Sequence, residues 1–452
     1  MSEITVVIPN YNGMRYLPEC MTSLCERQED APEYEVLIID NASADGSVEY
    51  LEKEWCRKSG VRVSLIPMSE NTGFCHAVNL GIRKAQSPYV ILLNNDTKVE
   101  PVFLRRLYDA IREDERIFSV SAKMLMWDKP ELIDVPVREP RDNEVLVKTA
   151  FSTISCGTER ANLTGSTNVG PGGGMPVYPV ALGYSTSGIV EKIGKDVTSV
   201  APGDRVAMYW TVHAEYNTPI ERVVKITDER VSLRSAALMH IGCFPLAALR
   251  KTRLEIGESM LVMGLGILGQ FAVTLAHAAG AVPVIAADPN PVRREEALAG
   301  GADYAFDPTE PGFAEKVKVL TGGGVNTCIE VTGVGAGLNE ALDCMAPFGR
   351  VALLGCTRNP NFTVDYYQKV HKPGITLIGA HTMARPEKES RPGWFTVRDD
   401  IQSLMKLVGE GRIDLESKIC ETHSPLDGVA VYNRLIEDKN FPTVVQFDWS
   451  QL

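Results

Sequence analysis

One stretch of this chain constrains its fold more than any other. The apolar run Met260–Met263 leads into the turn Gly264-Leu-Gly-Ile-Leu-Gly269, a helix-like stretch follows, and Ala286-Ala-Asp288 closes the next apolar run. A buried strand, a glycine turn, a helix and a distal carboxylate in this order are the elements that hold a dinucleotide. The sequence therefore predicts a parallel sheet covered by helices, with a dinucleotide at its edge.

Each polar or glycine position of this stretch has its own physical task. Gly264 allows the tight turn, Gly266 lets backbone N–H groups approach a pyrophosphate, and Gly269 lets helix and strand pack closely. Asp288 can accept hydrogen bonds from ribose hydroxyls and repels a 2′-phosphate. The pattern favours NAD(H), and NADP(H) is the alternative because two arginines follow at 293–294.

Size and composition limit the partners. A chain of 452 residues predicts two or three domains, and its net charge of −12 argues against nucleic acid or an anionic membrane as a partner. There is no apolar run of about 18 residues, so we expect no membrane span. Residues 1–9 predict a core strand and not a leader, and the ten cysteines include no Cys-x-x-Cys pair. We therefore expect a cytoplasmic protein with reduced thiols.

The spacing of apolar residues divides the chain into differently patterned parts. The first part alternates strands and helices, which predicts a mostly parallel sheet. Its expected strands are 4–9, 34–40, 62–67 and 89–93, and its expected helices are about 14–28, 46–58, 74–85 and 101–113.

From about 135 to 245 the chain carries short β-branched runs broken by glycine and proline, with few helices, which predicts a β-rich barrel-like domain. Alternation returns from about 247 to 382. The expected strands are 144–149, 187–193 and 205–208, then 260–263, 284–287, 327–332, 350–354 and 376–379, with a helix at 399–407 and an extended run at 443–447. The glycine tract at 170–174 predicts a loop and not a phosphate cradle, because no strand leads into it.

Several motifs in consistent order give residues 131–452 a family resemblance. They are Ser155-Cys-Gly-Thr-Glu159, Gly183-Tyr-Ser185, Pro202-Gly-Asp-Arg-Val206, His213-Ala-Glu-Tyr216 and Gly349-Arg-Val-Ala-Leu-Leu-Gly355. This part resembles the medium-chain dehydrogenase/reductase superfamily of zinc-type alcohol dehydrogenases, and is most similar to its bacteriochlorophyllide-dehydrogenase-like branch. The resemblance implies a GroES-like catalytic domain at 131–247 plus 383–452, an inserted Rossmann domain at 248–382, and hydride transfer between a nicotinamide and an alcohol or carbonyl substrate.

The expected zinc ligands match the family only in part. The resemblance puts Cys156 at the first ligand position and Cys243 at the third, but Tyr184 stands at the second, where zinc members have histidine. A catalytic zinc holds three protein ligands, so the set is one short unless His240 or His213 supplies it. The alternative is that both cysteines are small side chains that fill space in the cleft wall, so the sequence leaves zinc binding undecided.

Without zinc, another group must handle the proton that accompanies hydride transfer. The resemblance implies that Thr158 is a hydroxyl relay, and Tyr184 is the nearest O–H donor. The alternative for Tyr184 is a half-buried aromatic residue whose hydroxyl is already hydrogen-bonded. Glu159 would orient neighbouring groups. Thr332 and Gly333 would follow the strand beneath the nicotinamide ring.

The first part of the chain has a second resemblance. Val6-Val-Ile-Pro-Asn-Tyr-Asn-Gly13, Ile38-Ile-Asp-Asn-Ala-Ser-Ala-Asp-Gly-Ser47, Asn71-Thr-Gly-Phe74 and Leu92-Leu-Asn-Asn-Asp-Thr97 are similar to the N-terminal half of family 2 glycosyltransferases with the GT-A fold. The resemblance implies a truncated GT-A-like domain at 1–130 that contacts a nucleotide sugar. The expected contacts are Pro9, Asn12, Asp40, Asn41, Asn94 and Asp96, with Asp96 as a ligand for Mg²⁺ or Mn²⁺.

The transferase motifs stop near residues 130–134, before any half that would bind an acceptor, and segment 123–135 fits both families. We therefore expect an NAD(H)-dependent oxidoreductase fused to a nucleotide-sugar-binding fragment that is inactive alone. The alternatives are a glycosyltransferase with the dehydrogenase part as a passenger, and a fusion without catalysis. The expected partners are a small alcohol or carbonyl compound and a nucleotide sugar. Segments 164–180 and 381–396 would line the cleft, and a homodimer would pair through the strand Thr376–Gly379.

Overall fold

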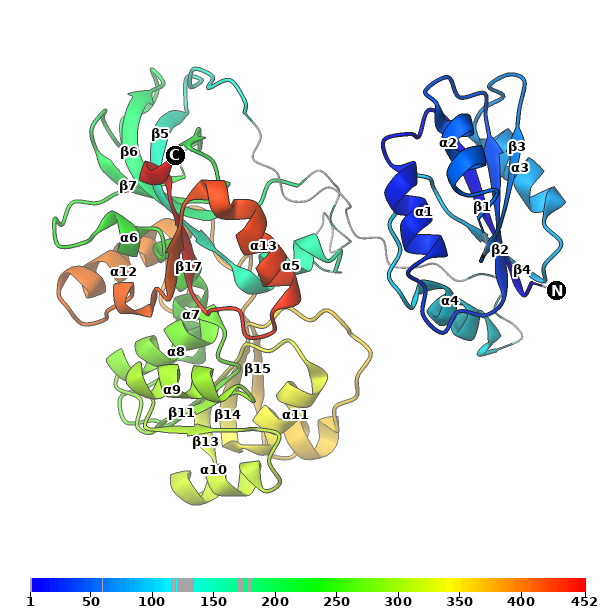
Figure 1. The fold of residues 1–452 in the computed structure, drawn as a ribbon. Coiled ribbons are helices and arrows are strands. Elements are labelled where there is room, and N and C mark those ends of the chain that lie inside the picture. Colours follow the sequence, from blue (N-terminus) through cyan, green and yellow to red (C-terminus); the bar gives the residue numbers. More distant parts are fainter. Residues whose placement is uncertain are drawn as a thin grey trace. The chain divides into compact units, whose positions relative to one another are not determined.

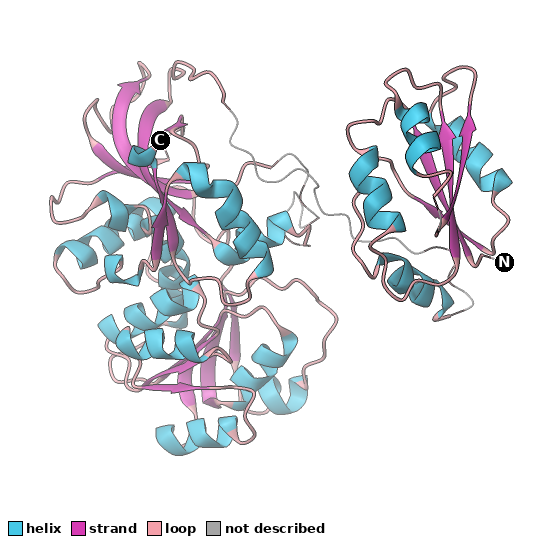
Figure 2. Cartoon of the chain, in the orientation of Figure 1, coloured by secondary structure: helices cyan, strands magenta, loops and turns pink. Residues whose placement is uncertain are grey.

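The structure is a computed structural model. It describes residues 2–452 apart from residues 59, 115–116, 118, 120–133, 167, 169–173, 175, 177–179 and 221. The chain divides into two compact units, Met1–Trp127 and Asp128–Leu452 (Figures 1 and 2). The segment expected to fit both families, 123–135, lies outside the described residues except at its last two positions. Most of the glycine tract 170–174 and part of the expected cleft segment 164–180 lie outside them too.

The first unit is a four-stranded parallel sheet in the order β3-β2-β1-β4. Its strands are β1 (Ile4–Asn10), β2 (Tyr34–Asp40), β3 (Arg62–Pro67) and β4 (Tyr89–Leu92), and its helices are α1 (Leu17–Cys25), α2 (Ser47–Glu54), α3 (Phe74–Lys84) and α4 (Phe103–Arg112). Every residue of β1 is buried, as expected of a central parallel strand covered on both faces. The parallel register brings the carboxyl ends of β1 and β2 together, with Asn10 beside Asp40.

The helices of this unit cover the two faces unequally. Buried side chains of α1, α2 and α4 form one core with Ile4, Val6 and Ile8, while α3 is the one described helix that packs on the other face. Gly81 lets α3 approach closely, because a Cβ there would lie 2.3 Å from Cγ1 of Val7.

The second unit contains a seven-stranded, mostly antiparallel sheet in the order β16-β17-β5-β6-β7-β9, with β8 paired to β5. Its strands are β5 (Val145–Ile154), β6 (Ser185–Ile193), β7 (Arg205–Tyr209), β8 (Tyr216–Asn217), β9 (Val223–Lys225), β16 (Glu421–His423) and β17 (Val445–Asp448). The elements around it are α5 (Cys156–Leu163), α6 (Leu233–Ala236), α12 (Val397–Gly409), η3 (Glu416–Lys418), η4 (Pro425–Asp427), α13 (Gly428–Glu437) and η5 (Trp449–Gln451). The C-terminal strand β17 pairs with β5, so the tail completes this sheet.

The other sheet of this unit is six-stranded and parallel, in the order β12-β11-β10-β13-β14-β15. Its strands are β10 (Met260–Met263), β11 (Val284–Ala287), β12 (Tyr304–Phe306), β13 (Val325–Glu330), β14 (Met345–Leu353) and β15 (Thr376–Gly379). Its helical elements are α7 (Met239–Thr252), α8 (Ile267–Ala278), α9 (Pro291–Ala299), α10 (Phe313–Thr321), α11 (Gly335–Asp343) and η2 (Tyr367–His371). The strand order reverses between β10 and β13, which is where open α/β sheets bind ligands.

Two elements of the second unit differ from the sequence-based expectation. Helix α5 was not expected, because its sequence around Gly157 has no apolar periodicity; it forms where β5 ends and packs against α13. Helix α7 runs across residue 247, where we expected a domain boundary, and is buried along most of its length despite Pro245. Among the described helices, none has the length and apolar character needed to cross a membrane.

Glu144 anchors the start of the seven-stranded sheet. Its carboxylate is 2% exposed, accepts hydrogen bonds from Arg138 Nη2 and from the N–H of Arg141, both at 2.9 Å, and lies next to β5. The Arg138 guanidinium lowers the pKa of Glu144 to about 2. The folded state therefore favours the ionised carboxylate.

We predict that Glu144→Gln lowers the free energy of unfolding of the second unit by about 1–3 kcal/mol at pH 7, as lost hydrogen bonds to a charged group do. Because the folded-state pKa is depressed, this contribution is fully present above the unfolded pKa of about 4.3 and is lost as the pH falls toward 2. Calorimetric unfolding of both proteins from pH 7 down to about pH 2.5, which covers the interval between the two pKa values, measures it. A difference that grows on acidification would contradict the assignment.

Candidate functional site

The glycine turn after β10 is held by close backbone contacts. Gly264 has a φ of +96°, and a Cβ there would lie 2.9 Å from Cγ2 of Thr332. A Cβ on Gly269 would lie 1.9 Å from the carbonyl oxygen of Gly264, so only glycine lets α8 pack against the turn. At Gly266, just before α8, a Cβ would meet no heavy atom of the described residues within 4 Å. The side-chain position of Gly266, at the start of α8, is therefore open.

Asp288 lies where β11 ends and is 6% exposed. Its Oδ2 accepts the N–H of Leu265 and its Oδ1 the N–H of Asn290, both at 2.8 Å. The carboxylate thus connects the glycine turn after β10 to the start of α9, which follows β11. Sequence reasoning did not anticipate this structural role. Each oxygen retains a lone pair for a ligand hydroxyl.

The two arginines that left NADP(H) open are both engaged. Arg293 Nη1 lies 3.8 Å from Asp288 Oδ2. Arg294 Nη1 donates to the carbonyl oxygen of Asp288 at 2.7 Å and to that of Pro289 at 2.9 Å, and lies 3.5 Å from Asp307 Oδ2.

A cleft of about 870 Å³ opens beside this turn, between the ends of β10, β11 and β13. Gly264, Asp288 and Thr332 line it. Four further carboxylates and one lysine line it as well: Glu310, Glu315, Glu340, Asp343 and Lys318. Sequence reasoning missed these residues because they stand on helices and loops without a motif.

Glu330 positions the backbone of the predicted residues Thr332 and Gly333, which follow β13. Its carboxylate accepts the N–H of Thr332 at 2.8 Å and that of Gly333 at 3.2 Å. Burial raises the pKa of Glu330, and these hydrogen bonds oppose the rise. Gly333 has a φ of +62°, and a Cβ there would lie 2.6 Å from the carbonyl oxygen of Cys356.

The predicted catalytic residues Thr158 and Tyr184 lie together. Tyr184 precedes β6, and its hydroxyl donates to Ser155 Oγ at the start of α5. Burial raises the pKa of the Tyr184 phenol, and hydrogen bonding to Ser155 and Thr158 opposes the rise. The Tyr184 ring packs against the rings of Trp210, His240 and Phe244, with centroids 5.7, 5.5 and 5.8 Å away.

Glu159 is 1% exposed and collects donors from distant parts of the chain. It accepts the N–H of Ser155 at 2.8 Å, the hydroxyl of Tyr432 at 2.6 Å and His213 Nε2 at 3.1 Å. His213 Nδ1 lies 2.8 Å from Ser152 Oγ. The glutamate thus fastens α5 to the tail of the chain.

The expected zinc ligands do not come together. Cys156 Sγ lies 3.6 Å from the carbonyl oxygen of Pro442, whereas Cys243 Sγ lies 3.7 Å from that of Val397. Burial raises the pKa of the Cys156 thiol to about 12 and that of Cys243 well above its ordinary value. No group of three or more His, Cys, Asp or Glu residues in the described part of the chain could hold a metal ion. The residues present therefore do not fit a catalytic zinc.

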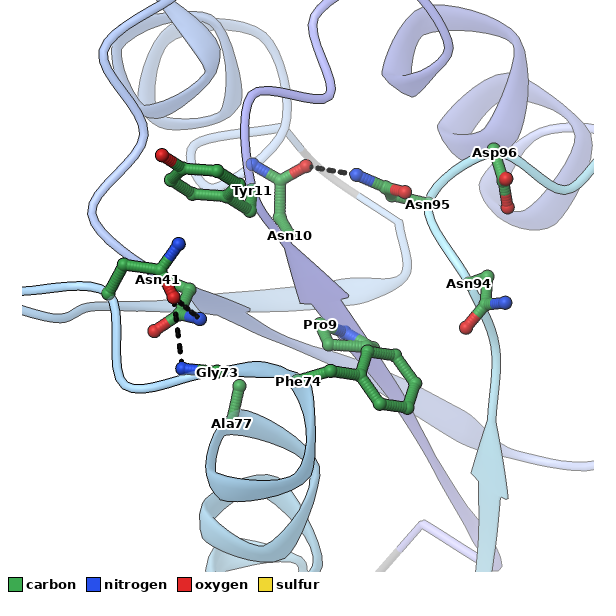
Figure 3. A pocket seen from close by; sticks show the side chains of 11 residues that line it. Pro9, Asn10, Tyr11, Asn41, Gly73, Phe74, Ala77, Asn94, Asn95 and Asp96 are labelled. Carbon is green, nitrogen blue, oxygen red and sulfur yellow. Dashed lines mark hydrogen bonds between the residues drawn. The ribbon is translucent and has the colours of Figure 1, made fainter.

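In the first unit, a cleft of about 400 Å³ lies at the carboxyl ends of the strands. Four of the predicted nucleotide-sugar contacts line it, namely Pro9, Asn41, Asn94 and Asp96. Figure 3 shows the Phe74 ring between Pro9 and the loop that carries Asn94. Asn94 and Asp96 are exposed, as a metal ligand and a diphosphate contact would need to be.

Asp40 and Asn12 differ from their expected roles. Asp40 is 0% exposed, and its carboxylate accepts Asn10 Nδ2 at 2.7 Å and both donors of Ser43, so it is turned away from the cleft. Asn12 accepts the N–H of Ala44 at 2.9 Å and does not line the cleft. The sequence shows a polar strand end, but not whether a side chain faces a ligand or its own loop.

Asn10 takes the place in the cleft that we had given to Asp40. Its Oδ1 accepts a hydrogen bond from Asn95 Nδ2 at 2.6 Å (Figure 3). Its own Nδ2 donates to Asp40 Oδ2. Both asparagines stand inside the quoted motifs, so motif position was the signal that could have found them.

Comparisons with known proteins agree with this division. Residues 5–131 match the family described as glycosyl transferase family 2, residues 141–244 the alcohol dehydrogenase GroES-like domain, and residues 268–393 the zinc-binding dehydrogenase family. The chain thus joins a segment that matches family 2 glycosyltransferases to a unit that resembles zinc-type dehydrogenases.

Curated and solved relatives cover the dehydrogenase unit. L-threonine 3-dehydrogenase of Pyrococcus horikoshii is 28% identical over 68% of this chain and 94% of its own length. D-arabitol-phosphate dehydrogenase of Enterococcus avium is 25% identical over 72% of this chain and 96% of its own length. In fold, the unit is similar to an Escherichia coli CFT073 alcohol dehydrogenase solved with NADH, with a TM-score of 0.60 at 19% identity over 71% of this chain and 96% of that one. The comparisons therefore support an oxidoreductase like those of the zinc-type dehydrogenase family, whose members bind NAD(P) and zinc.

We predict that Gly269→Ala destabilises the dehydrogenase unit by about 1–3 kcal/mol, because the new Cβ would overlap the Gly264 carbonyl and push α8 from the turn. Gly266→Ala is the matched control, since its Cβ enters open space at a φ of −67°. Scanning calorimetry of the full chain compares them. Equal melting temperatures for both variants would refute the packing account of the turn.

Proposed function

We propose that the chain is an NAD(H)-dependent oxidoreductase that transfers hydride between the nicotinamide and an alcohol or carbonyl substrate. The observation that carries this proposal is the open N-terminus of α8 at Gly266, beside a cleft at the point where the strand order reverses. A helix N-terminus without a side chain in front of it attracts a pyrophosphate through its free N–H groups and its dipole.

The cleft's charge supports NAD(H) over NADP(H). Asp288 and four other carboxylates line the cleft, and Lys318 is the one basic residue among the described residues that line it. A 2′-phosphate would enter a negative field there, and Arg294, which could offset it, already binds two carbonyl oxygens. Asp288 keeps acceptor capacity for the ribose hydroxyls.

The hydroxyls around Tyr184 support the proton-handling role. During carbonyl reduction, negative charge develops on the reacting oxygen, and a fixed neutral O–H stabilises it. Burial raises the Tyr184 pKa, so the phenol stays protonated at ordinary pH and remains a donor. Ser155, hydrogen-bonded to it, extends the relay, and Thr158 acts on the same phenol by lowering its pKa. Cys156 borders this group as a thiol and carries no step of the reaction.

We predict that Gly266→Ala weakens NADH binding at least about tenfold, a cost of about 1.4 kcal/mol, because its methyl group would occupy the approach of the pyrophosphate. Fluorescence titration of the full chain with NADH measures the dissociation constant. Gly428→Ala is the control, because that residue starts α13 and its Cβ would make only an ordinary contact 3.9 Å from Phe447. Unchanged NADH affinity in Gly266→Ala, at an unchanged melting temperature, would remove the cofactor assignment.

A second candidate function concerns the first unit: we propose that it binds a nucleotide sugar with Mg²⁺ or Mn²⁺ and does not transfer the sugar alone. The open cleft with Asn94 and Asp96 at its mouth favours this. Carboxylate and amide oxygens suit hard divalent cations.

We expect calorimetric titration with UDP- and dTDP-sugars to give manganese-dependent binding that Asp96→Asn weakens about tenfold, as loss of one charged ligand does. Asp109→Asn, on α4 and paired with Arg105, is a control of equal charge change. Sugar transfer to water or an added acceptor would overturn the inactive part of this proposal, and binding insensitive to Asp96→Asn would overturn its site.

A further inference from the structure

Polar groups around Tyr184 are hydrogen-bonded to it at the position where the family pattern expects a zinc ligand. We infer that this dehydrogenase unit carries no catalytic zinc, and that Ser155 and His240 instead hold Tyr184 as the hydrogen-bond donor to the reacting oxygen. The inference rests on the proposed oxidoreductase function, which it deepens.

The two thiols contact different segments of the chain and belong to no described group of three possible metal ligands. Cys156 Sγ lies among the carbonyl oxygens of Ile154, Pro442 and Thr443, at 3.8, 3.6 and 3.8 Å. Cys243 belongs to the core between α7 and α12, where Arg385 Nη2 donates to its carbonyl oxygen at 3.0 Å. Zinc binds thiolates that converge at about 2.3 Å, and these side chains contact different segments.

Neither histidine completes a ligand set. Both ring nitrogens of His213 are engaged, with Ser152 and with Glu159. His240 is 0% exposed, and its Nδ1 lies 2.7 Å from the carbonyl oxygen of Tyr184, so Nδ1 carries the proton. Its Nε2 has no hydrogen-bond partner among the described residues and could supply one ligand, whereas a catalytic zinc takes three from the protein.

Tyr184 is fixed at both ends. Its carbonyl oxygen accepts His240 Nδ1–H and, at 2.9 Å, the N–H of Trp210, while its hydroxyl donates to Ser155 Oγ. The His240 ring stands edge-on to the Tyr184 ring at 84°, and Phe244 packs on both. To donate to a reacting oxygen, the Tyr184 O–H turns from Ser155 Oγ, whose own O–H can then donate to the phenol oxygen. The packed ring and the fixed neighbours keep this reorganisation smaller than the one that solvent would need.

The chemistry balances without a metal. In carbonyl reduction the hydride of NADH bonds to the carbonyl carbon, the C=O π pair moves to oxygen, and the Tyr184 O–H proton bonds to that oxygen. The phenolate then takes the Ser155 Oγ–H proton, and Ser155 takes one from water. The sum is carbonyl plus NADH plus a proton giving alcohol plus NAD⁺, and alcohol oxidation is the reverse.

The first test is metal content. The purified full chain is equilibrated with zinc, passed through metal-free buffer and analysed by elemental mass spectrometry, together with Cys156→Ser and with Cys420→Ser, an exposed-cysteine control. We expect zinc far below one equivalent in all three proteins, and no thiolate-to-cobalt charge-transfer band after Co²⁺ titration. One equivalent of zinc in the unmodified chain that Cys156→Ser abolishes and Cys420→Ser retains would overturn the inference.

The second test separates the two nitrogens of His240. An asparagine places an amide N–H near the Nδ1 position, and a glutamine reaches the Nε2 position. We expect His240→Asn to keep most of kcat for carbonyl reduction and His240→Gln to lose about tenfold, the effect of one lost hydrogen bond on Tyr184, with NADH affinity unchanged in both. If His240→Gln kept kcat and His240→Asn lost it, the nitrogen that matters for kcat would be Nε2, and the positioning role of Nδ1 would be refuted.

A third variant distinguishes this inference from the function on which it rests. Tyr184→Phe should lower kcat about 100-fold or more and leave the NADH dissociation constant unchanged. Failure of the unmodified chain to bind NADH would refute the proposed function, while the zinc measurement would still stand. NADH binding with a full kcat in Tyr184→Phe would refute the inference alone.

Discussion

The contact between Gly269 and the carbonyl oxygen of Gly264 is the constraint on which the second unit depends. A methyl group at Gly269 would lie 1.9 Å from that oxygen, so α8 can begin directly above the end of β10 only because a side chain is missing. Asp288 completes the arrangement by accepting the N–H of Leu265 from the same turn. Close packing and a buried carboxylate together hold the turn before α8 beside a cleft that Gly264 and Asp288 line. A helix N-terminus close to such a cleft suits a diphosphate.

Much of the fold could be predicted, because its main elements have strong local signals. Strands β2 (Tyr34–Asp40), β11 (Val284–Ala287) and β15 (Thr376–Gly379) have the predicted bounds, since continuous apolar runs closed by polar or glycine residues determine them locally. Helix α5 could not be predicted, because its hydrogen bonds and packing depend on the tail of the chain through Glu159 and Tyr432.

The site was predictable where backbone geometry determines it and less so where side-chain direction does. The tasks of Gly264 and Gly269 follow from sterics that glycine motifs record. The turning of Asp40 toward Ser43, and of Cys156 toward Pro442, depends on loop conformations and on contacts between residues far apart in the chain. The zinc question shows this limit best: the sequence supplied two thiols and two imidazoles, and the fold places them in different hydrogen-bonded groups.

The central claim, that the glycine turn seats a dinucleotide, is tested most directly by hydrogen–deuterium exchange of the full chain with and without NADH. The account predicts slower exchange of the backbone N–H groups at 266–268, which would bond the pyrophosphate, and of those near Asp288, with no change in the first unit. Unchanged exchange at 266–268 under saturating NADH, or protection confined to the first unit, would contradict it.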